Sequence, residues 1–308
     1  MRKLVLKEPN CRLQSSFSKI FLFIIFRKKT LEAVLNYFET IPSHHRALII
    51  VGGLTFFWLL EGIMPLFGKP YKRWKHAVPN IFFTITTILV NLPLAFLLLK
   101  SSDWVMVHNF GILNWLPEMP LWLYAIVGLL LMDFIGAYLP HYVEHKVKPL
   151  WMVHLVHHTD HNVDTTTANR HHPLESIIRY VFTLVGVFVI GTPIALVMLY
   201  QSLSVVATQF NHANIRLPKR VDAILSYFIV SPDMHKVHHH YRLPYTDSNY
   251  GNIFSVWDRL CGTFMTLDPD KIIYGVDVFP DKKKNGNIGE LLKQPFQKYD
   301  KPTMHHNR

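Results

Sequence analysis

The sequence predicts an all-α fold, an integral membrane bundle of about four to five embedded helices that carries a histidine-rich cap. Three observations support this prediction. Residues 46–67, 77–99 and 121–140 are apolar runs long enough to cross a bilayer core, which takes roughly 20 residues. The run 77–99 has no charge on any face, which argues against an amphipathic helix of a soluble bundle. Histidines gather beyond the ends of these runs.

The N-terminal segment, residues 1–45, is expected to lie at the membrane interface. It combines basic residues with an apolar run, but Lys19 interrupts this run. The basic residues 27–29 follow where a cleaved signal peptide would have small side chains. We therefore expect residues 12–26 to form an interfacial anchoring helix.

The remainder is predicted to be one membrane-embedded domain, residues 46–268, and a tail. A fourth apolar region covers residues 177–210, and Gly191, Thr192 and Pro193 stand at its middle. This break predicts two helices that turn back on each other in place of one long helix. Clusters of Pro, Asp and Lys predict a loop-rich tail over residues 269–308.

The formal charge of +11 is placed as in a membrane protein and does not indicate nucleic-acid binding. The loop 68–76 carries four Lys or Arg residues, whereas the loop 101–120 carries none. By the positive-inside rule, the loop 68–76 and the histidine-rich cap face the cytoplasm; the basic residues 27–29 fall on the opposite side in this scheme. The expected location is the cytoplasmic membrane of a bacterium or the endoplasmic reticulum of a eukaryote.

The histidines form boxes with helical spacing. Of 19 histidines, 13 fall between residues 141 and 240, in groups that include "HYVEH", "HLVHH" and "HKVHHH". Residues three and four apart share one face of a helix, so each box directs two or three imidazoles to one side. Neutral imidazole binds Fe, Zn, Cu and Ni, and about nine ring nitrogens suffice for two metal ions. The boxes predict these ligands: His141, His145, His154, His157, His158, His235, His238 and His239.

Two other kinds of protein share part of this pattern. "HYVEH" fits the H-x-x-E-H motif of inverted zinc peptidases, with Glu144 as the base, but that leaves the other two boxes without a role. A non-enzymatic metal-binding or transport protein is the second alternative. Transporters place ligands near the middle of their spans, whereas these boxes lie just past the ends of apolar runs.

The ordered boxes, with "NRHHPLE" between them and "DSNYGNIFSVWDRLCGTF" after them, resemble the fatty acid hydroxylase superfamily, also called the sterol desaturase family. The resemblance covers roughly residues 120–268. It implies a membrane oxygenase that uses a histidine-bound non-haem diiron centre and dioxygen to hydroxylate or desaturate a lipid. Zinc is the alternative occupant of such a site in purified protein. The resemblance also implies a ninth ligand, His212.

Three positions depart from the family pattern. Tyr142 stands where Arg is usual, and Cys261 stands where an aromatic residue is usual. Thr208 stands where relatives often carry His or Asn, so a water is expected in place of one protein ligand. The chain has no haem-binding or flavin signature of its own, so the expected partners are a lipid substrate and a separate electron donor, a reductase with or without a small carrier.

Further residues are expected to support the ligands. Asp133 precedes His141 by two helical turns and is expected to accept the N–H of a ligand histidine. Arg170, His172 and Glu175 resemble the family's R-x-H-P-x-E element and are expected to orient ligands, with binding of a lipid head group as the alternative. Asn214, Asp247 and Asn249 are also expected to support the ligands, and Asp247 and Asn249 to shape a turn over the site.

An alkyl chain that reaches the metals from the bilayer must pass apolar side chains near the ligands. Side chains one to two turns from a ligand lie roughly 5–10 Å from it along the helix. The residues expected to line such a tunnel are Phe134, Ile135, Tyr138, Val205 and Val206, with helix packing as the alternative role. The sequence identifies neither the lipid nor the carbon that reacts.

Overall fold

The computed structural model describes residues 29–68 and 71–298. Within these ranges the regular secondary structure is helical, and the β-type pairings are isolated bridges. The predicted all-α class is therefore confirmed. The interfacial helix expected over residues 12–26 lies outside the described residues.

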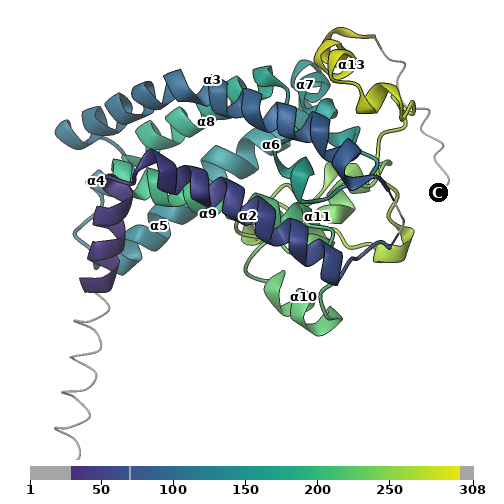
Figure 1. Ribbon diagram of the computed structural model, residues 1–308. Coiled ribbons are helices and arrows are strands. Elements are labelled where there is room, and N and C mark those ends of the chain that lie inside the picture. Colours follow the sequence, from purple (N-terminus) through teal and green to yellow (C-terminus); the bar gives the residue numbers. More distant parts are fainter. Residues whose placement is uncertain (1–28, 69–70, 299–308) are drawn as a thin grey trace, which may run out of the picture.

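Five helical segments in the described ranges are long and apolar enough to cross a membrane. The first three are α2 (Ser43–Ile63), α3 (Arg73–Val107) and a segment over 121–146 that joins α5 (Leu121–Asp133), the π-helical turn η1 (Phe134–Tyr138) and α6 (Leu139–Lys146). The other two are α8 (Pro173–Ile190) and α9 (Ile194–His212). In Figure 1 these helices fill the part of the molecule away from the C-terminal tail.

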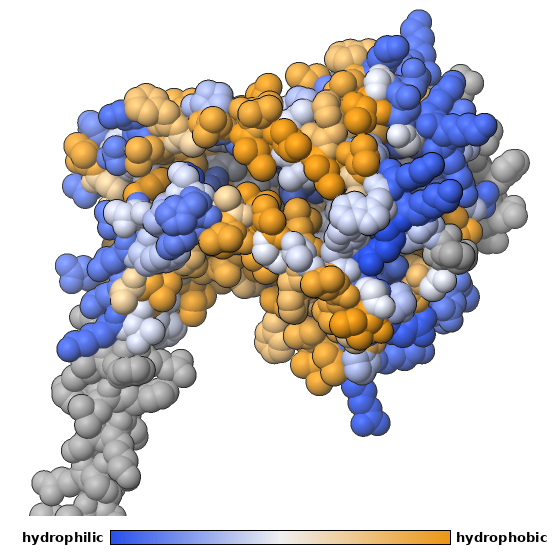
Figure 2. Space-filling view, in the orientation of Figure 1, coloured by the Kyte–Doolittle hydropathy of each residue, from blue (hydrophilic) through white to orange (hydrophobic). Residues whose placement is uncertain are grey.

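The outer faces of these helices are apolar. In α3, Ile85, Leu89, Leu92 and Phe96 are between 51% and 68% exposed, with Leu92 the most exposed of the four. A soluble protein rarely leaves so large an apolar surface in contact with water. Figure 2 shows hydrophobic surface along the helices and around α10, and hydrophilic surface on the side of the cap that carries the C-terminal tail. The helices are therefore suited to lipid as their surroundings.

The predicted break in the fourth apolar region is confirmed. Gly191 ends α8 in the left-handed conformation, with φ 78°, and Pro193 precedes α9. A Cβ atom on Gly191 would lie 2.3 Å from the carbonyl oxygen of Phe110, so only glycine fits this turn. With 18 and 19 residues, the two helices are long enough to approach a full span each.

The two ends of the bundle have different partners. At one end, the side chain of Asn114 donates to the Gly191 carbonyl at 3.1 Å, which joins the α4 region (Ile112–Trp115) to the α8–α9 turn. At the other end, the Arg216 N–H donates to the Met64 carbonyl at 2.9 Å, so the chain after α9 pairs with the chain after α2. The α8–α9 hairpin thus begins and ends at the cap.

The cap consists of short helices and loops at that second end (Figure 1). Its helices include α7 (Lys148–His158), η2 (Thr165–Asn169), α10 (Lys219–Leu225), α11 (Pro232–His238) and α12 (Val256–Leu260). The tail, expected to be rich in loops, also has short helices, of which α13 (Ile288–Lys293) is one. Leu291 of α13 packs with Phe83 and Val156, which fixes the tail against α3 and α7.

Candidate metal centre

Nine imidazoles meet where the bundle joins the cap, and they form two groups within the described part of the chain. In each group, one nitrogen of every ring lies within 4.8 Å of the corresponding nitrogens of the others. The five-histidine group consists of His141, His145, His154, His158 and His238. The four-histidine group consists of His157, His212, His235 and His239.

Each H-x-x-H-H box contributes to both groups. In α7, His154 and His158 are four apart and enter the five-histidine group, whereas His157 enters the four-histidine group. In the box at α11, His235 and His239 are four apart and enter the four-histidine group, whereas His238 enters the five-histidine group. The spacing therefore connects two adjacent sites through the same two helices. His158 of the five-histidine group and His239 of the four-histidine group stack with ring centroids 4.8 Å apart.

The four-histidine group converges on His212. Its Nε2 lies 3.0 Å from Nε2 of His157, 3.1 Å from Nε2 of His235 and 3.2 Å from Nε2 of His239. The Nδ1 of His212 donates to the Thr208 carbonyl at 2.8 Å, so Nε2 presents a lone pair to the group. Several buried lone pairs directed at one point are costly unless a cation binds there. The donor set fits a metal ion.

In the five-histidine group, backbone carbonyls fix two rings. Nδ1 of His141 donates to the Tyr250 carbonyl at 2.9 Å, and Nδ1 of His238 donates to the Ser248 carbonyl at 2.7 Å. A carbonyl only accepts, so in both rings Nδ1 carries the proton and Nε2 is the free acceptor. These two Nε2 atoms, and that of His145, are buried and have no hydrogen-bond partner among residues 29–68 and 71–298. Free Nε2 atoms held in this way are typical of metal ligands.

Burial keeps the imidazoles of the cap neutral. His154, His157 and His158 are at most 2% exposed, and His235, His238 and His239 are at most 3% exposed. This burial, followed by the proximity of other histidines, lowers the pKa of each of the six well below its usual value. Metals bind the neutral ring, so the cap holds these side chains in the form that a metal requires.

Comparison with known proteins agrees with this geometry. The profile of the fatty acid hydroxylase family matches residues 125–263, which contain all nine histidines. This segment of the chain belongs to the fatty acid hydroxylase family.

Three curated relatives of the chain are longer proteins. Human alkylglycerol monooxygenase is 24% identical over 88% of this chain and 59% of its own length. The ornithine lipid hydroxylase of Rhizobium tropici is 24% identical over 60% of this chain and 54% of its own length. The zebrafish alkylglycerol monooxygenase is 32% identical over 46% of this chain and 30% of its own length. The chain thus spans less than two thirds of the length of these relatives. No solved structure matches it significantly.

Two of the expected supporting residues contact histidines of the five-histidine group. Glu175 Oε1 lies 2.8 Å from Nδ1 of His154, and Asp247 Oδ1 lies 3.2 Å from Nδ1 of His145. Asp247 also accepts from Lys146 at 2.7 Å. Burial alone would raise the pKa of Asp247, but the hydrogen bonds from His145 and Lys146 outweigh it and lower this pKa to about 2. Both carboxylates are therefore placed to orient a ring of the five-histidine group.

Among the described residues, the hydrogen-bond partners of Asp133 include no histidine, which corrects the expectation from spacing. Its carboxylate accepts from the N–H groups of Ile253 and Phe254 at 3.2 Å and 3.1 Å, and from the indole of Trp257 at 3.1 Å. The π-helical turn η1 separates Asp133 from His141 and changes the helical register between them. Asp133 ties the loop after residue 252 to the third span.

The R-x-H-P-x-E element also differs from the expectation. Arg170 donates to the Val156 and Asn285 carbonyls and to the side chain of Asn80, so it joins α7, α3 and the tail without contacting the histidine groups. His172 accepts from Leu174 N–H as the cap of α8. Its neighbour, His171, faces the centre, with its ring 4.9 Å from that of His157.

In the described part of the chain, the side chains of the two expected asparagines form hydrogen bonds with the backbone. The side chain of Asn214 accepts from the Phe67 N–H at 3.1 Å and donates to the Phe67 carbonyl at 3.2 Å. Asn249 donates to the Met234 and Met265 carbonyls, both at 2.8 Å, and adopts a positive φ of 52°. Asn249 thereby holds the loop whose Ser248 and Tyr250 carbonyls orient two histidines.

Sequence reasoning missed one buried network. Arg179 donates to Glu144 at 2.7 Å and to Glu175 at 2.9 Å, and both carboxylates are buried beside His154. The sequence suggests a role for Glu144 only as the base of a peptidase motif. An arginine four residues after Glu175 on one helix face was the available signal.

The expected tunnel residues divide into two sets. Phe134 and Tyr138 stack with ring centroids 5.6 Å apart, and Tyr138 lies 6.2 Å from the ring of Tyr250, which packs on the five-histidine group. Ile135 packs in the core. Val206 is 39% exposed on the outer face of α9, whereas Val205 precedes His212 by seven residues and shares its face. Val206 is therefore placed poorly for an enclosed path.

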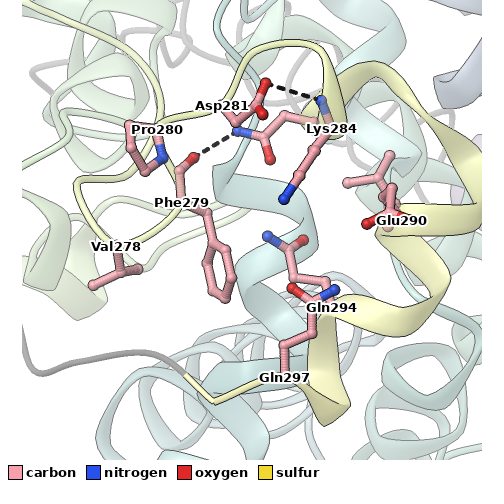
Figure 3. Close-up of a pocket in the computed structure, with 10 residues that line it drawn as sticks. Val278, Phe279, Pro280, Asp281, Lys284, Glu290, Gln294 and Gln297 are labelled. Carbon is pink, nitrogen blue, oxygen red and sulfur yellow. Dashed lines mark hydrogen bonds between the residues drawn. The ribbon is translucent and has the colours of Figure 1, made fainter.

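A small surface cavity of about 180 Å³ lies in the tail (Figure 3). The ring of Phe279 and the side chains of Lys284 and Gln294 border it, and Asn285 donates to the Phe279 carbonyl at 2.7 Å. Its lining includes no histidine. This cavity is separate from the metal centre.

Proposed function

We propose that the chain is an oxygen-dependent lipid hydroxylase whose nine histidines hold two iron ions, one in each histidine group. The observation that carries this proposal is the convergence of nine buried imidazoles on two adjacent points at the cap end of five apolar helices. Imidazole is a common ligand of non-haem iron, and nine nitrogens leave positions open at two ions.

When bound, two reduced irons supply the dioxygen activation that an unactivated C–H bond requires. The residues of this chain prepare the site. Glu175, Asp247 and the carbonyls of Ser248 and Tyr250 fix ring orientations. Trp151 packs over His145 with centroids 4.6 Å apart, and Tyr250 packs over the same ring at 5.0 Å. These aromatic rings keep bulk water away from the five-histidine group.

The names of the relatives support hydroxylation in preference to desaturation. They include monooxygenases of alkylglycerol, a hydroxylase of ornithine lipid and a putative methylsterol monooxygenase of Dictyostelium discoideum. All three substrates are lipids. The position of the histidine groups at the ends of apolar helices suits a substrate that approaches from the bilayer.

The arrangement of the histidines and of Glu144 argues against the two alternative functions, a peptidase and a metal transporter. A peptidase would need Glu144 as a free base, but Glu144 is buried and ion-paired with Arg179 at 2.7 Å. A transporter would need ligands near the middle of its spans, but all nine histidines lie in the cap or in the last two turns of a span at the cap end.

The side of the membrane and the electron donor belong to the same proposal. The cap end carries Lys72, Arg73, Lys75 and the lysines at 282–284, whereas the segment 101–120, which contains the end of α3 and α4 at the other end, has no Lys or Arg. The positive-inside rule therefore supports a cytoplasmic cap. There a separate reductase, with or without a small carrier, supplies electrons.

The test is a comparison of lipid extracts from cells that express the wild-type chain or His157→Ala. We expect a lipid that is heavier by one oxygen only with the wild-type chain. His240→Ala serves as the matched control, since His240 lies outside both groups. The same product from His157→Ala would contradict the proposal.

A further inference from the structure

Five large apolar side chains outside the candidate spans are exposed around α10. Their exposed fractions run from 44% to 72%. We call this set the α10 patch: Val221, Ile224, Tyr227, Phe228 and Leu260. Two contacts place Leu260 of α12 beside the other four members. The Arg259 guanidinium lies 5.0 Å from the centre of the Tyr227 ring, and the Ser255 N–H donates to the Phe228 carbonyl. Figure 2 shows this hydrophobic surface at the lower edge, where Figure 1 places α10.

Both ends of the segment that carries the α10 patch are tied to membrane helices. Before α10, Arg216 N–H donates to the Met64 carbonyl, directly after the end of α2. After the patch residue Phe228, Ile229 forms a bridge with Phe254, whose N–H donates to Asp133. The patch is therefore held at the side of the bundle and does not project from the top of the cap.

The contact with Asp133 fixes the depth. The candidate span 121–146 has 26 residues, and Asp133 is the thirteenth of them. At 1.5 Å per residue, Asp133 lies roughly 20 Å along the helix from the cap end at Lys146. Trp257, three residues before Leu260, donates to the same carboxylate. The chain around α12 thus lies beside the middle of a candidate span.

The basic and aromatic residues around α10 suit a segment that lies at the level of a membrane leaflet. Lys219 and Arg220 at the start of α10 are exposed, and the side chain of Arg216 is 59% exposed. Basic residues next to an apolar face, with Tyr at the boundary, are typical of segments that lie in a membrane interface. A soluble cap surface would gain nothing from exposing five large apolar side chains together.

We propose that the α10 patch is inserted among the acyl chains of the cap-side leaflet, with Lys219 and Arg220 at the lipid headgroups. The cap is then partly embedded, and phospholipid is its partner at this surface. This inference does not depend on the proposed activity, because it rests on exposure and on the ties to α2 and Asp133.

The test uses single cysteines that carry an environment-sensitive fluorophore, in protein whose Cys11 and Cys261 are replaced by Ser. Ile224→Cys and Phe228→Cys report on the α10 patch. Leu92→Cys, at a position 68% exposed in α3, is the reference for lipid contact, and Lys284→Cys in the exposed tail is the reference for water. The labelled proteins are placed in phosphatidylcholine nanodiscs with nitroxide-labelled acyl chains or with aqueous iodide.

We expect the nitroxide to quench positions 224 and 228 several-fold, as at position 92, with little effect of iodide. Quenching by iodide as at position 284 would overturn the proposal. Protection from both quenchers would also overturn it, because it would show that protein and not lipid covers the patch. Each labelled variant must elute as the wild-type protein does, which excludes misfolding as the cause of either result.

Discussion

Glu175 Oε1 lies 2.8 Å from Nδ1 of His154, and neither side chain is exposed to solvent. The carboxylate orients the ring so that Nε2 faces the five-histidine group. Glu175→Gln removes the negative charge and weakens this bond. Loss of such a partner typically lowers metal affinity 10- to 100-fold. We expect a loss in that range on titration of the purified apoprotein with Fe²⁺, with Glu290→Gln in the tail as the control. Unchanged affinity would refute the orienting role.

His157 and His238 test whether there are two metal ions. The wild-type chain is expected to hold two ions, and each substitution by Ala removes one ligand from a different group. We expect metal content per chain to fall in both variants, by about one ion each, while the protein stays in the membrane. Elemental analysis of purified protein gives the count. His240→Ala is the control and should keep two ions. Full metal content in His157→Ala and His238→Ala would contradict the assignment.

Asp133 is predicted to act on stability and not on metal binding. Asp133→Leu keeps a similar volume but leaves the N–H groups of Ile253 and Phe254 and the Trp257 indole without an acceptor. An unsatisfied buried donor costs about 1–3 kcal/mol. We expect a lower midpoint of thermal unfolding in detergent, with metal per folded chain unchanged. Asp277→Leu on the exposed tail should leave the midpoint unchanged. Loss of metal from folded Asp133→Leu would restore the ligand-supporting role.

The hairpin predicts the sidedness of three positions. Residues 148 and 216 lie at the cap end, and Glu118 lies in the loop at the opposite end. Lys148 and Arg216 are exposed and therefore accessible to a label. Single cysteines at 148 and 216 should react with an impermeant maleimide from the same side of sealed vesicles. The variant Glu118→Cys should react from the other side. Opposite sides for 148 and 216 would rule out a shared centre.

Val205 and Val206 distinguish a substrate path from helix packing. Val205 shares the helix face of His212, whereas Val206 is 39% exposed on the outside. We expect Val205→Phe to shift the oxidised position or to favour a shorter chain, and Val206→Phe to keep the parent products. Mass spectrometry of the product lipids decides. If both variants keep the parent profile with full metal content, the path does not run along this face of α9.

The fold and the histidine boxes were predictable because they depend on local periodicity. The apolar runs predict the spans, and Gly191 with Pro193 predicts the turn. The division into two groups was not predictable, because His157 and His158 are neighbours in sequence and separate only when α7 and α11 pack together. The expectation for Asp133 was wrong because the π-helical turn changes the register before His141. His171 and His172 are consecutive, and the sequence does not show which of them faces the metal centre. The path of the chain into α8 decides this: His171 faces the centre, and His172 caps α8.

The source of the oxygen in the product tests the central claim most directly. Purified wild-type protein in nanodiscs, loaded with Fe²⁺ and supplied with a chemical reductant, an extract of its native lipids and ¹⁸O₂, should yield a lipid that carries one ¹⁸O atom. A product that has lost two hydrogens and gained no oxygen would contradict hydroxylation. A product whose added oxygen comes from water, or metal-loaded protein that leaves every lipid unchanged, would contradict an oxygen-dependent hydroxylase.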